Sequence, residues 1–283
     1  MDSLIKENIP MNEYTSLKIG GRARFFANPS NKEELKKALG FAKEKDIPIF
    51  ILGGGTNTLI KDEGVRGMVI KLDGDFKNIE RQGLEVKAGG GASLASLISY
   101  CQGFSLSGLE NLAGIPGSVG GAIFGNAGAF GTQIGDCVKS VVVMDRDGNE
   151  RIVKDINFFY RGSSLKDTII LEVLFSLKED VRWRIDEKIA SVLSKRRETQ
   201  PISKQTAGCI FKNPEGKFAG ELIEKAGLKG RSIKDAIVSI KHANFIENRG
   251  NAKAEDVLQL ITFIKRRVYE LYGVMLYEEI VVI

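Results

Sequence analysis

The sequence of 283 residues predicts an α+β protein with more than one domain. Apolar residues recur at helical spacing in some segments, such as 254–272, and form short unbroken runs typical of buried strands in others, such as 47–52. The chain is also longer than an average domain, so two domains, or three small ones, are expected.

Charge and glycine are distributed unevenly along the chain. Residues 1–180 contain 22 basic and 23 acidic side chains, a net charge of −1, whereas residues 181–283 contain 19 and 13, a net charge of +6. Glycine has the opposite bias, since 23 of the 32 glycines precede Asp136. The front part is therefore expected to bring its backbone close to a ligand, and the back part to favour something anionic.

The elements of the front part follow from hydrophobic spacing and from capping and turn residues. Expected there are a helix over 31–45 with Leu35, Ala38, Leu39 and Ala42 on its apolar face, strands at 47–52, 65–72 and 84–88, and a helix capped by Ser93 with Leu94, Leu97, Ile98 and Cys101 inward. A second sheet is expected from strands at 138–145, 151–153 and 168–177, with Asp147-Gly148 as a hairpin turn.

The pattern changes after Val181. Expected there are helices over 186–197, 218–226 and 254–272, the last with Val257, Leu260, Ile261, Ile264, Val268 and Leu271 inward, and a closing strand over 275–283. These patterns place the main domain boundary near residue 180 and a lesser division near residue 70. The expected segments are therefore 1–70, 71–180 and 181–283.

Several classes of protein are disfavoured by composition. The uncharged stretch 111–135 is long enough to raise the question of a membrane span, but its many glycines and Pro116 indicate loops. Three cysteines are too few for a disulfide scaffold, and no charged-then-apolar leader is seen, so a reducing cytoplasm is expected. The single histidine, His242, excludes a His-rich zinc site, and no metal site is expected. Without a nucleic-acid motif, the mild basic surplus is weak evidence for such a partner.

Glycine clusters end or interrupt the strands of the front part at Gly53-Gly54-Gly55, at Gly89-Gly90-Gly91 and from Gly108 to Gly135. Glycine allows backbone N–H groups to approach phosphate oxygens. No lysine follows in the register of a P-loop, which excludes a P-loop NTPase, and Leu94 replaces the third glycine of a dinucleotide fingerprint. One cluster alone would more often serve a tight turn, but three clusters indicate a ligand site.

Seven motifs follow one another from Thr15 to Phe245: Thr15-Ser16-Leu17-Lys18-Ile19-Gly20-Gly21, Leu52-Gly53-Gly54-Gly55-Thr56-Asn57, Ala113 to Gly121, Asn126-Ala127-Gly128-Ala129, Tyr160-Arg161-Gly162-Ser163, Ala207-Gly208-Cys209-Ile210-Phe211-Lys212-Asn213-Pro214 and Lys241-His242-Ala243-Asn244-Phe245. Together with Glu279 in the closing strand, they resemble the family of UDP-N-acetylenolpyruvoylglucosamine reductases, flavoenzymes of cytoplasmic peptidoglycan synthesis and thus of cell-wall biogenesis. The short stretch after Arg161 resembles the compact branch (type II), which lacks an inserted loop in the substrate domain.

The resemblance implies the fold and the reaction. It implies a two-lobed FAD-binding domain of the vanillyl-alcohol-oxidase type, followed by an α+β substrate-binding domain. Within this fold, 1–70 and 71–180 are the expected FAD-binding lobes and 181–283 the substrate domain. NADPH would reduce a non-covalently bound FAD, which would pass hydride to C3 of the enolpyruvyl group of UDP-N-acetylglucosamine enolpyruvate and give UDP-N-acetylmuramate.

The resemblance also implies three catalytic residues. Arg161 would hold the substrate carboxylate, where negative charge develops, with its planar fork of donors. Cys209 stands where most relatives have serine and would donate the proton to C2, since a thiol is more acidic than an alkyl hydroxyl. Glu279 is the third residue. Its neighbour Glu278 is the rival, because adjacent strand residues face opposite ways.

The remaining site residues are implied in the same way. FAD would contact Gly53, Gly54, Gly55, Thr56, Asn57, Gly114, Ile115, Pro116, Gly117, Ser118, Gly120, Gly121, Asn126, Ala127 and Gly128, and the UDP-sugar would contact Arg197, Lys212 and Asn213. His242 fits a hydrogen-bonded structural histidine better than an acid–base group, and Asn244 fits a structural role as well.

Two other functions stay open at this point. One is a different FAD oxidoreductase of the same fold, acting on an alcohol or a sugar. The other is a non-catalytic nucleotide-sugar or nucleic-acid binding protein, which leaves the glycine clusters unexplained. No coiled-coil pattern demands a second copy, so a monomer is expected.

Overall fold

The computed structural model describes residues 4–283, which form two compact units. The first unit contains the described N-terminal residues as far as Glu7, then Phe25–Gly54 and Arg66–Lys195. The second contains Asn8–Arg24, Gly55–Val65 and Arg196–Ile283. Each unit is thus assembled from several segments, whereas the expected ranges 1–70, 71–180 and 181–283 are continuous. The division into two flavin lobes and a substrate domain stays a prediction.

Five of the six α-helices among the described residues follow the expected spacing, whereas Val119–Phe124 is a helix within the stretch 111–135 that was expected to form loops. The α-helices are α1 (Lys32–Glu44), α2 (Leu94–Gly103), α3 (Val119–Phe124), α4 (Arg182–Thr199), α5 (Ala219–Lys225) and α6 (Ala254–Tyr272), and short 3-10 helices cover Met11–Tyr14, Gly74–Lys77, Glu110–Leu112 and Ile134–Cys137. Side-chain caps explain two of the starts, because Asn31 accepts from the backbone N–H of Glu34 before α1 and Ser93 from that of Ser96 before α2. The helix expected over 186–197 begins four residues earlier, at Arg182.

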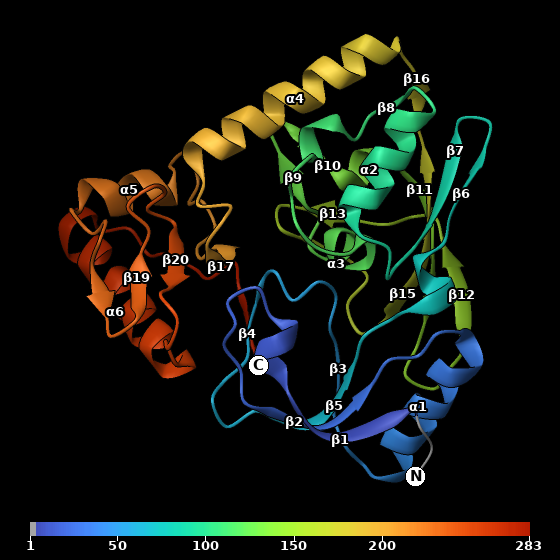
Figure 1. The fold of residues 1–283 in the computed structure, drawn as a ribbon, viewed down its shortest axis with the longest axis horizontal. Coiled ribbons are helices and arrows are strands. Elements are labelled where there is room, and N and C mark those ends of the chain that lie inside the picture. Colours follow the sequence, from blue (N-terminus) through green and yellow to red (C-terminus); the bar gives the residue numbers. More distant parts are fainter. Residues whose placement is uncertain (1–3) are drawn as a thin grey trace. The chain divides into compact units, whose positions relative to one another are not determined.

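Two larger sheets carry the first group of strands (Figure 1). One has the order β1-β2-β5-β3, with β1 (Ile5–Pro10), β2 (Arg22–Ala27), β5 (Val65–Ile70) and β3 (Ile49–Ile51). The other has the order β12-β11-β15-β7-β6, with β12 (Glu150–Val153), β11 (Val138–Met144), β15 (Ile169–Ser176), β7 (Glu85–Gly89) and β6 (Ile79–Gln82). The expected second sheet therefore exists, and it also includes the strand predicted at 84–88.

Three short strand pairs complete the first unit. They are β9 (Gly128–Ala129) with β10 (Thr132–Gln133), β13 (Phe158–Phe159) with β14 (Gly162–Ser163), and β8 (Leu106–Ser107) with β16 (Lys178–Glu179). The first two pairs place the Asn126 and Arg161 motifs on tight hairpins.

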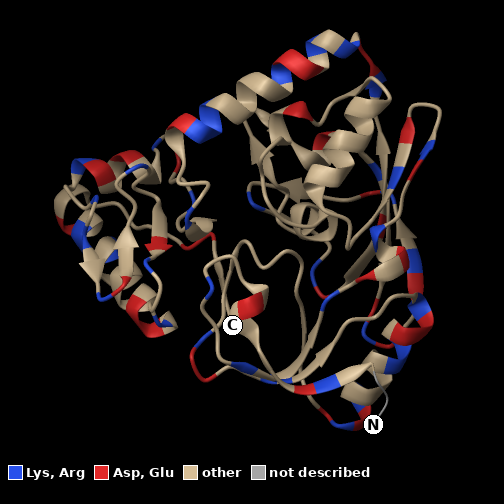
Figure 2. Ribbon diagram, viewed as in Figure 1, with Lys and Arg blue, Asp and Glu red and all other residues tan. Residues whose placement is uncertain are grey.

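Two hydrophobic cores stabilise the first unit. In one core, α2 and α3 pack with the five-stranded sheet through Leu94, Val119, Ile123 and Val173 among others. In the other, α1 packs with β5 and with the ends of β11 and β15. The helices α2 and α3 carry no charged side chain, as their tan colour in Figure 2 shows. The glycine loops beside them therefore lie in an apolar part of the unit.

The second unit is built around a sheet of order β17-β20-β19-β18. Its strands are β17 (Gln205–Cys209), β20 (Phe245–Asn248), β19 (Ala236–Val238) and β18 (Ser232–Ile233). The helix α6 packs on β18 and β19, and its buried residues Val257, Leu260, Ile261, Ile264 and Val268 agree with the predicted inward face. Leu271, expected inward, is 44% exposed, so that part of the prediction is wrong. It lies at the last turn of α6, where the helix extends beyond its core.

The closing strand expected over 275–283 is also wrong in its length. Only β21 (Val281–Val282) is a strand, and it pairs in parallel with β4 (Thr58–Leu59). The residues just before β21 lie beside a different segment, because Glu278 forms an isolated β-bridge with Phe211. The segment thus changes partners midway and forms no continuous ladder.

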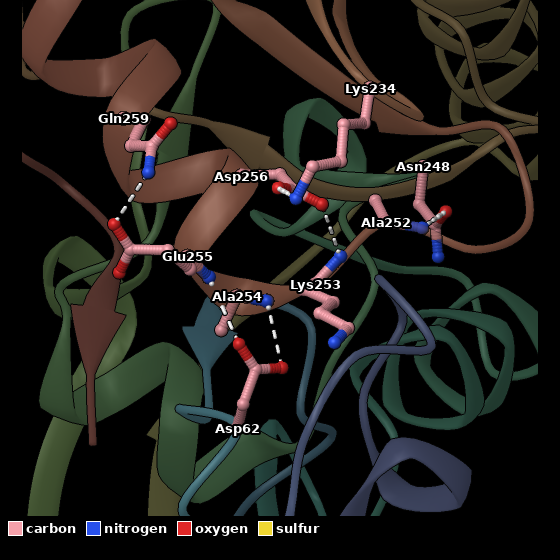
Figure 3. A network of polar contacts seen from close by, with 9 residues as sticks. All are labelled: Asp62, Lys234, Asn248, Ala252, Lys253, Ala254, Glu255, Asp256 and Gln259. Carbon is pink, nitrogen blue, oxygen red and sulfur yellow. Dashed lines mark hydrogen bonds and ion pairs between the residues drawn. The ribbon is translucent and has the colours of Figure 1, made fainter.

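Segments distant in sequence are tied to α6 by polar contacts (Figure 3). The two carboxylate oxygens of Asp62 accept from the backbone N–H groups of Ala254 and Glu255, each at 3.1 Å. Within the same network, Lys234 pairs with the buried Asp256 at 2.8 Å, and Asn248 accepts from the N–H of Ala252 at 3.0 Å. Asp62 therefore caps the first turn of a helix that begins 192 residues later.

Replacing Asp62 with alanine is expected to destabilise the second unit by about 1 kcal/mol, because two N–H groups at a positive helix end lose their acceptor. Asp62 is exposed, so water replaces part of the loss. Urea unfolding of Asp62→Ala beside Glu63→Ala, an exposed neighbour of the same charge, measures the effect. Equal free energies of unfolding for the two variants would contradict the capping role.

Candidate active site

The structure brings the three glycine clusters together in the first unit. A Cβ on Gly54 would lie 2.7 Å from Cα of Gly117, and one on Gly53 would lie 2.5 Å from Oγ of Ser118. The backbone N–H of Gly120 donates to the carbonyl of Gly90 at 2.8 Å. The loops around residues 54, 90 and 117 are therefore packed backbone to backbone, at distances that only glycine permits.

The loop of residues 114–118 leads directly into α3. Ser118 caps this helix, because its Oγ accepts from the N–H of Gly121 at 3.1 Å. Gly54, Gly114 and Gly121 stay exposed although their loops are tightly packed. The site thus presents bare main chain at a surface, which is the arrangement that lets phosphate oxygens approach amide donors.

Lys71 is a residue of this region that the sequence analysis did not select. Its Nζ donates to the carbonyl of Gly53 at 2.9 Å. Burial lowers the pKa of Lys71, and the positive charge of Lys77 lowers it further. The available signal was a lysine that interrupts the apolar run 65–72. The ammonium of Lys71 therefore stabilises the loop of Gly53 through this hydrogen bond.

The Asn126 motif and Arg161 lie next to one another in the first unit. The guanidinium Nη1 of Arg161 donates to the carbonyl of Gly128 at 3.3 Å, and the group lies over the ring of Tyr160. Asn126 is 2% exposed, and its amide contacts Gln133, Gly135 and Phe159 within the protein. Asn126 therefore shapes the hairpin, while Arg161 is half-buried beside it.

Cys209 and Glu279 are brought together in the second unit. Cys209 is the last residue of β17, and the residue after it, Ile210, accepts from the N–H of Glu279 at 2.8 Å. The carbonyl of Glu279 in turn accepts from the side chain of Asn57 at 3.1 Å. Cys209 and Glu279 thus lie on neighbouring extended segments, and both are half-buried.

The contacts of Glu278 differ from those of Glu279. Glu278 forms an ion pair with Lys265 of α6 at 2.8 Å. Its carboxylate is therefore neutralised by a partner within the unit. This ion pair gives Glu278 a structural role.

The two arginines at the end of α4 differ sharply in burial. Arg196 is 7% exposed, whereas Arg197, the predicted substrate contact, is exposed. Burial lowers the pKa of Arg196, and attraction to the Cys209 thiolate acts in the opposite direction. Arg196 was missed although its four-residue spacing from Val192, on the buried face of the helix, was the available signal.

Lys212 and Asn213 follow Cys209 along the chain. The backbone N–H of Lys212 donates to the carbonyl of Tyr277 at 2.9 Å, and the side chain is half-buried. The side-chain oxygen of Asn213 accepts from the N–H of Ala219 at 3.0 Å, at the start of α5. Asn213 thus has a capping role in addition to its predicted contact with substrate.

His242 accepts a hydrogen bond through Nδ1 from the backbone N–H of Asn244 at 3.3 Å. This acceptor role requires the neutral ring with its proton on Nε2. Burial lowers the pKa of His242, and Lys229 lowers it further, while Glu224 opposes the change. The contacts agree with the structural role predicted for this histidine.

The lowered pKa of His242 predicts a pH dependence of stability. The unfolded chain binds a proton more readily than the folded one, so stability falls as the pH drops below the ordinary value of 6.5. Thermal unfolding between pH 8 and pH 5 measures this dependence. The melting temperature of the wild type is expected to fall more steeply than that of His242→Gln, which cannot titrate, and parallel curves would contradict the prediction.

The described residues offer neither a membrane-spanning helix nor a metal site. Within residues 4–283, no helix is long and apolar enough to cross a membrane. In the same described part of the chain, no group of three His, Cys, Asp or Glu side chains is arranged to hold a metal ion.

Two family models match this chain in succession. Residues 23–154 match a family model described as an FAD binding domain, and residues 200–283 match the C-terminal domain of UDP-N-acetylenolpyruvoylglucosamine reductase. The reductase of Desulforamulus reducens is 45% identical over all of this chain and 96% of its own length. That of Aquifex aeolicus is 42% identical over 98% of this chain and 94% of its own.

A solved structure extends this likeness to the fold. The crystal structure of UDP-N-acetylenolpyruvylglucosamine reductase from Thermus caldophilus aligns with a TM-score of 0.87 at 38% identity, covering 98% of this chain and 99% of that one. The glycine-loop unit and the second α+β unit thus define an FAD-containing oxidoreductase. The fold class expected from the sequence is confirmed. The chain belongs to the family of UDP-N-acetylenolpyruvoylglucosamine reductases.

The residues present fit FAD. Its diphosphate needs close main-chain donors, and the exposed backbone at Gly54 and Gly114 offers them without a Cβ in the way. The uncharged helices α2 and α3 give the neighbouring region the apolar character that suits a flavin ring.

Proposed function

We propose that this enzyme catalyses the NADPH-dependent reduction of UDP-N-acetylglucosamine enolpyruvate to UDP-N-acetylmuramate. It would do so in the cytoplasm, as a monomer, in the synthesis of peptidoglycan precursors. The observation that carries the proposal is the adjacency of Cys209 and Glu279 through Ile210, in a chain that also carries glycine loops suited to FAD. A proton donor and a flavin site are the two parts that this reduction needs.

The proposed cofactor residues are those of the glycine-rich motifs. Non-covalent FAD would be held by Gly53, Gly54, Gly55, Thr56, Asn57, Gly114, Ile115, Pro116, Gly117, Ser118, Gly120, Gly121, Asn126, Ala127 and Gly128. Among these, Asn126 would act by shaping the loop, since its amide is engaged within the protein. When bound, FAD would supply the hydride that adds to C3 of the enolpyruvyl group.

Addition of hydride at C3 leaves negative charge on C2 and the carboxylate. Arg161 would hold that carboxylate with its guanidinium, which stabilises the developing charge. Cys209 would donate its thiol proton to C2 and would become a thiolate. The positive charge of Arg196 is suited to stabilise this thiolate, because a negative charge on Cys209 raises the pKa of the Arg196 guanidinium. Glu279 would orient the carboxylate end of the substrate or the donor.

The UDP part of the substrate would be bound by cations of the C-terminal third. Arg197 and Lys212 would contact the diphosphate, and Asn213 would contribute its amide. The net charge of +6 over residues 181–283 supports a binding region for an anionic ligand.

An anaerobic visible spectrum tests the whole proposal. The purified protein is expected to show a flavin spectrum that bleaches with NADPH and returns when UDP-N-acetylglucosamine enolpyruvate is added. A flavin that returns only with oxygen would support an oxidase of the same fold acting on another substrate. A colourless protein that cannot be reconstituted with FAD would contradict the cofactor assignment.

A further inference from the structure

The segment Lys241 to Phe245 has no part in the proposed chemistry, yet it contains one of the most buried polar side chains of the second unit. Asn244 is 3% exposed. It stands immediately before β20, opposite the residues that follow Cys209. A buried amide therefore lies next to the residue that pairs with Cys209, the proposed proton donor.

The hydrogen bonds of Asn244 join it to Ile210 and Phe211, and to His242 in the turn that precedes Asn244. Its side-chain Oδ1 accepts from the N–H of Phe211 at 2.9 Å, and its Nδ2 donates to the carbonyl of Phe211 at 2.8 Å. Its own carbonyl accepts from the N–H of Ile210 at 2.8 Å. The side-chain amide thus satisfies the donor and the acceptor of one residue at once, as a neighbouring strand would.

The other edge of the same stretch is paired with the Glu279 segment. The carbonyl of Ile210 accepts from the N–H of Glu279, and the N–H of Lys212 donates to the carbonyl of Tyr277. The residues after Cys209 are therefore held between Asn244 on one side and the Glu279 segment on the other. The ladder of β17 with β20 has a register shift between Thr206 and Cys209 and ends at the pair Cys209 and Phe245, so Asn244 continues it with a side chain.

The turn that carries Asn244 is itself fixed. Ser239, which is 1% exposed, accepts through Oγ from the N–H of Lys241 at 3.1 Å, and His242 accepts from the N–H of Asn244. The asparagine is thus a rigid support. Proton transfer to carbon depends on sub-ångström placement of the donor, so such a support affects rate more than binding.

We propose that Asn244 is a positioning residue that sets the place of the Cys209 thiol relative to Glu279 for proton transfer to C2. This inference rests on the proposed function, and it assigns Asn244 a part in the second half-reaction only. Asparagine suits the role because its amide both donates and accepts, whereas aspartate at neutral pH can only accept.

The test measures the two half-reactions separately in holoenzyme variants under anaerobic conditions. In Asn244→Ala and Asn244→Asp, NADPH is expected to reduce the flavin at the wild-type rate. Reoxidation by UDP-N-acetylglucosamine enolpyruvate is expected to be slower by about 10- to 100-fold. In Asn244→Asp the defect is expected to diminish as the pH falls, because a protonated carboxyl regains the donor for the Phe211 carbonyl. Asn251→Asp, the same change at an exposed site of this unit, is expected to behave as wild type.

Three outcomes would overturn the proposal: wild-type reoxidation in both Asn244 variants, equal slowing of both half-reactions, and failure of both variants to fold, which would assign Asn244 to global stability. Failure of the proposed function is distinct from these, because wild-type reduced flavin would then not be reoxidised by the enolpyruvyl sugar at all.

Discussion

Replacement of Cys209 by alanine is expected to slow reoxidation of the reduced flavin by the enolpyruvyl sugar by about 10²- to 10⁴-fold, because the substrate loses its proton donor. Reduction of the flavin by NADPH is expected to continue at the wild-type rate, since it needs no proton at C2. Anaerobic stopped-flow absorbance, with the two substrates added in turn, measures both steps.

Two further variants make the Cys209 experiment specific. Cys209→Ser keeps a donor and is expected to retain turnover. Cys137→Ala removes a half-buried thiol of the first unit that has no role in the proposed chemistry, and it is expected to leave both half-reactions unchanged. Equal reoxidation rates in the wild type and Cys209→Ala would remove Cys209 from the mechanism.

Replacement of Gly54 by alanine is expected to weaken FAD binding by roughly 10- to 100-fold, which corresponds to the 1–3 kcal/mol typical of overpacking. The added Cβ would lie 2.7 Å from Cα of Gly117, so two backbone loops must separate. Neither loop can respond by turning a side chain. The ratio of flavin to protein after purification, followed by titration of the apoprotein with FAD, measures the loss.

Gly40→Ala is the matched control for this change. Gly40 lies on the exposed face of α1, where an added Cβ meets nothing within 4 Å. Glycine in a helix interior is less stable than alanine by about 1 kcal/mol, so this variant is expected to melt at a higher temperature with full flavin content. Wild-type FAD affinity in Gly54→Ala would show that the contact between the loops does not shape the cofactor site.

The local structure of this chain could be predicted well where a periodic pattern and a cap agree. The helix over 254–272 was expected with its observed bounds, and Ser93 was expected to cap α2 as it does. The prediction failed at the chain terminus, because the residues from 275 pair first with 210–212 and then with 57–59, and such a change of partner leaves no periodic trace.

Some residues of the candidate site could be predicted from local sequence patterns, whereas others depend on long-range contacts. The glycine loops could be selected because close backbone approach demands glycine, whereas Cys209 and Arg161 were selected because their motifs resemble those of the reductase family. The contact of Lys71 with Gly53 and the burial of Arg196 were missed, because the local spacing of these residues indicates burial but does not identify their partners.

The sequence by itself determined the class of this protein through its motifs, and five of its helices through the spacing of near neighbours. Only the tertiary structure decided which of two glutamates is paired with Lys265, and that Asp62 caps a helix 192 residues away. It also decided that Asn244 supports the strand of Cys209. These contacts depend on hydrogen-bond geometry that forms only when the chain folds, so the local sequence does not specify them.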